Sequence, residues 1–162
     1  MTDSIAAALG GVLIADDDGD ICRLIQTLLS RSRIPTEVVY GGRAALACAE
    51  RQHYALVIID VCMGDMSGLD VCRAMKADPA FHAPILLMSC GDSTAQVAAC
   101  YEAGADDFLS KPFKSQELLA RVGRLIEANS AQHRLHAAAT TGPYGWAGSS
   151  RPCMSSVAML GG

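Results

Sequence analysis

Five polar side chains in this sequence combine a cluster of acids with a hydroxyl group and an ammonium group. The acids Asp16 and Asp17 stand in the run ADDDGD, and a third acid, Asp60, ends the apolar run YALVIID. Ser89 ends the run APILLMS, and Lys111 follows DDFLS. Clustered carboxylates bind Mg²⁺, a carboxylate can act as a nucleophile, and an ammonium group can hold a phosphoryl oxygen. These residue types together suit phosphoryl transfer.

The acids of ADDDGD divide into two groups. Like charges this close raise the cost of ionising one another, so a metal, a helix start or solvation must compensate. Asp18 is expected to cap the helix that follows, and Asp20 to complement its dipole. Taken alone, Asp16 and Asp17 fit a solvated turn as well as they fit a metal site. Because Asp60, Ser89 and Lys111 also stand at strand ends, we favour the interpretation that Asp16 and Asp17 share one site with them.

Alternating strands and helices are expected to position these residues. Short apolar, β-branched runs predict strands, and the segments between them carry the apolar spacing of helices. Such alternation implies an α/β fold, a parallel sheet with helices on both faces. Ligands bind such sheets at the carboxyl ends of the strands, so the polar residues there are expected to converge. The expected strands cover 12–16, 36–40, 54–60, 83–89 and 106–110, and the last helix covers 114–128.

We expect one domain over residues 11–127, followed by a low-complexity and mostly disordered tail over residues 128–162. The tail is rich in Ala, Gly and Ser and has no sustained period. In it, His133 and His136 stand three positions apart without a further ligand nearby in the sequence, so we expect no metal site there.

Composition restricts the class of protein. A net charge of −4 without a basic stripe argues against direct nucleic-acid binding. The longest apolar runs are too short to span a bilayer, and the start MTDSIAAALGG lacks the basic region of a signal peptide. We therefore expect a cytoplasmic location without membrane insertion. The seven cysteines have no paired spacing, which indicates reduced thiols.

Four motifs resemble those of the receiver domain of two-component response regulators. They are IADDD (14–18), LVIIDVCMGDMSGLD (56–70), PILLMSC (84–90) and GADDFLSKPF (104–113), in the order and spacing of that family. The resemblance covers most of the chain. It implies a doubly wound, five-stranded parallel sheet of the flavodoxin-like type, with strand order 2-1-3-4-5 and five helices.

The resemblance implies a magnesium-dependent phosphoacceptor site. Asp60 would accept the phosphoryl group and form an aspartyl phosphate. Asp17 and Asp60 would ligate Mg²⁺ together with the backbone carbonyl of Cys62, and Asp16 would join the metal site through water. Gly64 departs from the family's pattern, in which a proline usually stands at that position, and it frees the backbone after the acceptor.

Further roles follow from the same resemblance. Ser89 and Lys111 would hold the phosphoryl group, and Phe108 would be the aromatic switch residue. The phosphodonor would be a histidine kinase or a histidine phosphotransfer protein, and the signal would pass to an unidentified downstream protein. The chain would be a signalling domain rather than an enzyme, with at most self-phosphorylation and self-dephosphorylation.

Two alternatives stay open. DDDGD also fits the Asp-x-Asp-Gly pattern of haloacid dehalogenase-like phosphatases, in which Asp16 would be the nucleophile and Asp18 the general acid/base. That alternative leaves Asp60 unexplained, and in that family the lysine precedes the late acidic motif, whereas Lys111 follows the acids here. The second alternative is a receiver-like interaction module that is not phosphorylated.

Overall fold

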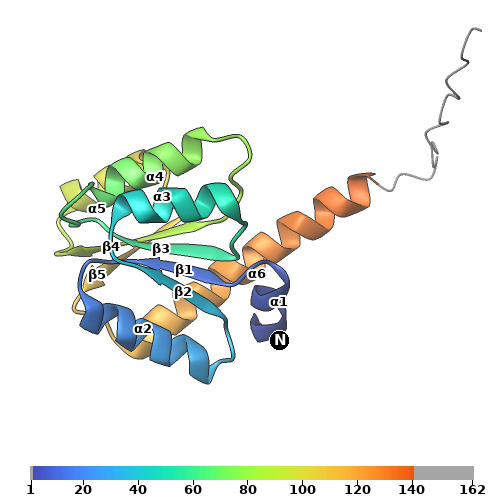
Figure 1. The fold of residues 1–162 in the computed structure, drawn as a ribbon, viewed down its shortest axis with the longest axis horizontal. Helices are drawn as coiled ribbons and strands as arrows, with labels where there is room; N and C mark the ends of the chain where they lie inside the picture. Colours follow the sequence, from blue (N-terminus) through green and yellow to red (C-terminus); the bar gives the residue numbers. More distant parts are fainter. Residues whose placement is uncertain (1, 141–162) are drawn as a thin grey trace, which may run out of the picture.

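The computed structural model describes residues 2–140 and is organised by a five-stranded parallel sheet (Figure 1). The strand order β2-β1-β3-β4-β5 confirms the expected topology, and every neighbouring pair is parallel. Polar residues that follow the ends of different strands are therefore brought to one edge. The strands are β1 (Val12–Ala15), β2 (Thr36–Val39), β3 (Leu56–Asp60), β4 (Ile85–Cys90) and β5 (Asp107–Lys111).

Helices cover both faces of the sheet. In Figure 1, α1, α2 and α6 lie on one side of the sheet, and α3, α4 and α5 lie on the other. The central strands are apolar at almost every position because both of their faces are covered. In β3, for example, Leu56 and Ile58 belong to one hydrophobic cluster, and Val57 and Ile59 belong to the other. The helices are α1 (Thr2–Ala8), α2 (Gly19–Arg31), α3 (Gly42–Arg51), α4 (Gly68–Ala77), α5 (Thr94–Glu102) and α6 (Ser115–Thr140).

The described residues form six helices, one more than the five expected. The additional helix is α1, near the start of the chain. Its seven residues are too few for a period to stand out in the sequence, and a helix this short is stabilised by tertiary packing. Ala6 is fully buried, and Ile5 and Leu9 pack against the cluster that α6 also joins.

The last helix also differs from its prediction, because α6 continues past the expected end at residue 128 to Thr140. Residues 128–140 are rich in alanine and contain neither glycine nor proline, so their helix propensity is high. Asn129 is buried, and its side-chain amide donates a hydrogen bond of 3.0 Å to the carbonyl of Ala55. The expected tail is therefore helical in its first part, and residues 141–162 lie outside the described residues.

Gly68, the first residue of α4, allows this helix to approach the end of β3 closely. Its amide donates to the carbonyl of Val61 at 2.9 Å. A Cβ atom at this position would lie 2.1 Å from the carbonyl oxygen of Asp60. At Gly123, by contrast, a Cβ atom would meet no heavy atom within 4 Å. The two glycines therefore form a matched pair for mutation.

We expect Gly68→Ala to lower the free energy of unfolding by about 1–3 kcal/mol, because the backbone must shift to admit the methyl group. Gly123→Ala is expected to raise it by roughly 0.5–1 kcal/mol, because alanine is the better helix former. Urea denaturation of both variants measures the two effects. Equal free energies of unfolding for the two variants would contradict the close approach at Gly68.

Candidate functional site

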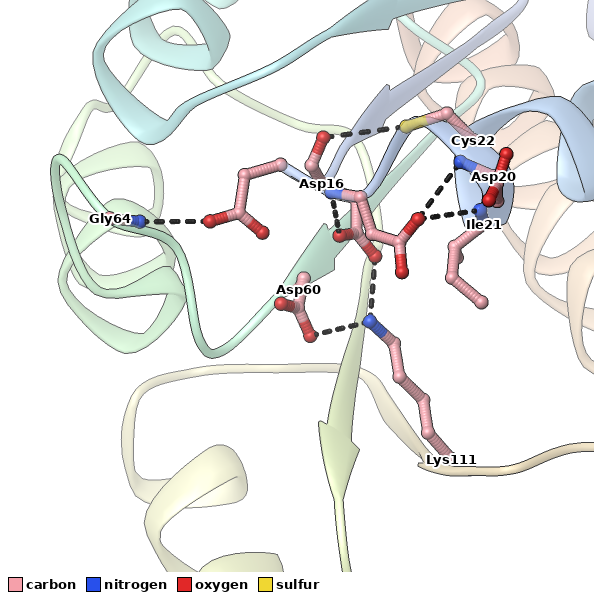
Figure 2. A network of polar contacts seen from close by, with 9 residues as sticks. Asp16, Asp20, Ile21, Cys22, Asp60, Gly64 and Lys111 are labelled. Atoms are coloured by element: carbon pink, nitrogen blue, oxygen red, sulfur yellow. Dashed lines mark hydrogen bonds and ion pairs between the residues drawn. The ribbon is translucent and has the colours of Figure 1, made fainter.

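Three predicted site residues come together at the carboxyl edge of the sheet, as Figure 2 shows. Asp16 directly follows β1, Asp60 ends β3, and Lys111 ends β5. The ammonium nitrogen of Lys111 lies 2.7 Å from Asp16 Oδ2 and 3.0 Å from Asp60 Oδ1. Asp16 is fully buried, Asp60 is 3% exposed, and the lysine side chain is 14% exposed. Buried charges require this kind of pairing.

The third acid, Asp17, lies beside the other two but is exposed. Each of the three aspartates has one carboxylate oxygen within 4.8 Å of the others. Asp17 Oδ2 also accepts a hydrogen bond of 3.2 Å from the amide of Gly64, in the loop that follows β3 (Figure 2). A proline at position 64 has no amide hydrogen and could not make this bond. Cys62 lies in the same loop, with an exposed side chain.

The remaining acids of ADDDGD serve the helix, as the sequence predicted. Asp18 Oδ1 accepts hydrogen bonds from the amides of Asp20 at 2.9 Å and of Ile21 at 3.3 Å, and so it caps α2. Asp20 lies in the first turn. The amide of Asp18 itself donates to Asp16 Oδ1 at 2.9 Å, which fixes the buried carboxylate from a second side.

Ser89 is 1% exposed near the end of β4. Its Oγ has no hydrogen-bond partner among the described residues, whereas Asp60 Oδ1 on the neighbouring strand lies 3.0 Å from the ammonium nitrogen of Lys111. Leaving a buried polar atom without a hydrogen bond costs free energy. The unpartnered hydroxyl of Ser89 indicates a place for a polar ligand.

Phe108, the predicted switch residue, is buried on β5. It belongs to the hydrophobic cluster that contains Leu87 of β4 and Cys100 of α5. Phe108 is thus joined to the site through β5, which also carries Lys111, and to the surface through α5.

Burial and neighbouring charges shift the pKa values of Asp60 and Lys111. Burial raises the pKa of Asp60 above its ordinary value; Lys111 opposes this rise, and the charges of Asp16 and Asp17 add to it. Burial lowers the pKa of Lys111, but its contacts with Asp16 and Asp60 outweigh burial and leave the pKa raised. Lys111 is therefore a permanent cation at neutral pH.

Asp65 is a structural residue of this region that the sequence patterns did not single out. Its carboxylate accepts hydrogen bonds from the amides of Gly42 at 2.9 Å and Arg43 at 3.0 Å, at the start of α3. These bonds lower the pKa of Asp65. The acid therefore ties the loop after Asp60 to a helix from another part of the chain, and no local sequence pattern reveals that partner.

The donor set fits a divalent metal. Three carboxylates face one ammonium group, so the ionised side chains leave an excess of negative charge. Mg²⁺ binds through a few carboxylates and keeps several waters, and its charge would relieve the repulsion between the acids. The structure thus brings together the predicted ligands Asp16, Asp17 and Asp60.

Comparisons with known proteins point to one family. Residues 12–123 match the response regulator receiver domain. The DNA-binding response regulator MtrA of Mycolicibacterium paratuberculosis is 34% identical over 118 residues, which are 73% of this chain and 52% of that protein. The heme response regulator HssR of Staphylococcus epidermidis is 31% identical over 114 residues, which are 70% of this chain and 50% of that protein. The chain thus spans about half the length of these relatives.

Solved structures agree with the sequence matches. The receiver domain of the Francisella response regulator 1452 is 32% identical with a TM-score of 0.69, and the match covers 72% of this chain and 96% of that one. The chemotaxis response regulator CheY4 of Vibrio cholerae is 28% identical with a TM-score of 0.65, and the match covers 70% of this chain and 96% of that one.

The raised pKa of Asp60 predicts how stability depends on pH without metal. The folded state holds this proton more tightly than the unfolded state, so stability is lost as pH rises from the ordinary value of 3.8 through the raised pKa. Asp60→Asn removes the ionisation. We therefore expect this variant to be more stable than wild type at pH 7, on the order of 1 kcal/mol, with the difference vanishing below pH 3.8.

Denaturation in EDTA across a pH series measures this difference. Asp18→Asn is the control, because asparagine caps a helix as well as aspartate does, and its stability should stay near that of wild type. If Asp60→Asn were less stable than wild type at pH 7, the attraction of Lys111 would outweigh burial, and the assigned direction would be wrong.

Proposed function

Because the chain belongs to the receiver domain family of two-component response regulators, we propose that Asp60 accepts a phosphoryl group from a phosphohistidine. The donor would be a histidine kinase or a histidine phosphotransfer protein. One observation carries the proposal: Asp60 ends the central strand with a buried oxygen that lies 3.0 Å from the ammonium nitrogen of Lys111.

Transfer needs an ionised acceptor and groups that hold the phosphoryl oxygens. A carboxylate oxygen of Asp60 attacks phosphorus, the bond from phosphorus to the imidazole nitrogen breaks, and the imidazole takes up a proton from solvent. The ammonium group of Lys111 stays protonated and holds one phosphoryl oxygen. The unpartnered hydroxyl of Ser89 donates to another.

The same site would hold Mg²⁺. Its protein ligands would be the carboxylates of Asp17 and Asp60 and the backbone carbonyl of Cys62, with Asp16 acting through water. Three aspartates with oxygens within 4.8 Å of one another support this set. When bound, the ion would neutralise charge on the phosphoryl oxygens.

Phosphorylation would act on the surface formed by α5, β5 and α6. We propose that the hydroxyl of Ser89 moves onto the phosphoryl group and that Phe108, which is already buried, shifts within its cluster into the space this opens. Phe108 shares a hydrophobic cluster with Leu87 of β4 and Cys100 of α5, which supports the coupling because packed elements have few alternative arrangements. The change would bias which downstream protein this surface binds.

We also propose what kind of partner receives the signal from this domain. The relative MtrA is named a DNA-binding response regulator, and the chain spans about half of it, so our expectation of no nucleic-acid partner is restricted to the receiver itself. We propose that the receiver acts through protein contacts. No helix among residues 2–140 is long and apolar enough to cross a membrane.

The phosphatase alternative is not favoured. It requires Asp18 as a general acid/base, but the carboxylate of Asp18 is engaged in capping α2. It also requires Asp16 as the nucleophile, but both carboxylate oxygens of Asp16 already accept hydrogen bonds, from Lys111 and from the amide of Asp18. The family match covers Asp60 as well as both of these acids.

We expect wild-type protein incubated with Mg²⁺ and acetyl phosphate to gain one phosphoryl group, as measured by intact mass. Asp60→Asn should gain none, because the nucleophile is absent. Lys111→Met should be phosphorylated at least tenfold more slowly, because the developing charge loses its cation.

Asp18→Asn is the matched control for these variants, because it makes the same chemical change in the acidic run and keeps the cap. It should be phosphorylated as wild type is. Full labelling of Asp60→Asn would refute the proposal. If wild type hydrolyses acetyl phosphate over many turnovers and both Asp16→Asn and Asp18→Asn lose this activity, the protein is a phosphatase instead. If wild type stays unlabelled when it is treated with a phosphorylated kinase, it is the interaction module that is not phosphorylated.

A further inference from the structure

The carboxylate of Asp17 is held in a different way from the other two acids of the cluster. Asp16 and Asp60 are buried and lie against the ammonium group of Lys111. Asp17 is exposed, and within the described part of the chain its one hydrogen bond comes from the backbone amide of Gly64, which donates to Oδ2 at 3.2 Å (Figure 2). The orientation of this third acid therefore depends on a single amide.

The bond from Gly64 leaves one oxygen of Asp17 available for a cation. An exposed aspartate samples several side-chain rotamers, and fixing one of them costs conformational entropy. A hydrogen bond to Oδ2 restricts that choice, while Oδ1 accepts no hydrogen bond from the described residues. Carboxylates that bind metals are commonly oriented by an outer hydrogen-bond donor of this kind.

The direction of the Gly64 amide is determined by anchored residues on both sides of it. Met63 is buried in the hydrophobic cluster between the sheet and helices α3 and α4. Asp65 accepts hydrogen bonds from the amides of Gly42 and Arg43 at the start of α3. Although the family's usual proline is absent, the loop around position 64 is therefore tied to the rest of the fold.

Neither space nor backbone strain requires a glycine at position 64. A Cβ atom there would lie 3.9 Å from Asp17 Oδ2, which is ordinary van der Waals contact. Gly64 is also not among the glycines with a positive φ, so its backbone conformation suits other residues. The feature that glycine and alanine share here, and that proline lacks, is the amide hydrogen.

We infer that the backbone amide of Gly64 is a positioning group for magnesium binding, which orients the carboxylate of Asp17 toward a cation that Asp60 and the carbonyl of Cys62 also bind. The inference rests on the magnesium site of the proposed function and adds to it a donor that proline could not supply. Cys62 lies two residues before Gly64, so the bond joins the loop that carries one proposed ligand to the strand end that carries another. Ligands that are arranged before the cation arrives bind it more tightly.

Magnesium titration of the full, unphosphorylated chain tests this inference with no phosphodonor present, and NMR amide shifts report the dissociation constant of Mg²⁺. Gly64→Ala keeps the amide hydrogen and Gly64→Pro removes it, so the two variants form a matched pair. We expect Mg²⁺ to bind to Gly64→Pro roughly tenfold more weakly than to Gly64→Ala, because the loss of an outer donor weakens metal binding to this extent.

Hydrogen exchange of the amide at position 64 separates the bond from a general effect of proline, which also restricts the residue before it. We expect this amide to exchange roughly threefold or more faster in Asp17→Ala than in wild type, because the variant has no acceptor. The amides of Gly42 and Arg43, which are bonded to Asp65, should exchange at the same rate in both proteins and are the control.

The remaining outcomes would overturn the inference. Equal Mg²⁺ affinities of Gly64→Ala and Gly64→Pro would show that the amide has no part in binding, while leaving the proposed function intact. Tighter binding to Gly64→Pro would make the amide a competitor of the cation. Exchange at position 64 that does not respond to Asp17→Ala would exclude the bond. A wild-type chain that binds no Mg²⁺ would refute the proposed magnesium site and this inference with it.

Discussion

The contact of one lysine with two buried carboxylates is the interaction on which the acidic edge depends. Asp16 and Asp60 follow neighbouring strands, and two buried anions so close would be unfavourable without a cation between them. Lys111 supplies that cation from β5, which is separated from β3 by β4. The strand order thus determines whether the charges are matched, and fold and site stabilise one another.

The polar groups at this edge are not fully paired with one another, and the unpaired charge and hydroxyl are what a ligand would satisfy. One ammonium group cannot balance three carboxylates, so a divalent cation bound at this edge would offset the remaining negative charge. The hydroxyl of Ser89 is buried without a partner among the described residues, and a phosphoryl oxygen would provide one. The loop after β3 is held by the hydrogen bonds of Asp65 to the start of α3 and by the close approach of Gly68, so the backbone that carries Asp60 is anchored on both sides.

The sequence was sufficient for the sheet and its carboxyl edge because both depend on local signals. Apolar runs that end in single polar residues predicted the strands and the meeting of Asp16, Asp60 and Lys111, and the structure confirms both. The features that escaped prediction depend on contacts between distant segments. The short helix α1 and the continuation of α6 are stabilised by packing, and the bond from Gly64 to Asp17 joins two loops.

The identity of the phosphorylated residue is the central claim, and chemical mapping tests it most directly. Borohydride reduces an aspartyl phosphate to homoserine, which peptide mass spectrometry locates within the chain. We expect homoserine at position 60 in wild-type protein treated with Mg²⁺ and a phosphodonor. Homoserine at position 16 or 17, with none at position 60, would contradict the assignment.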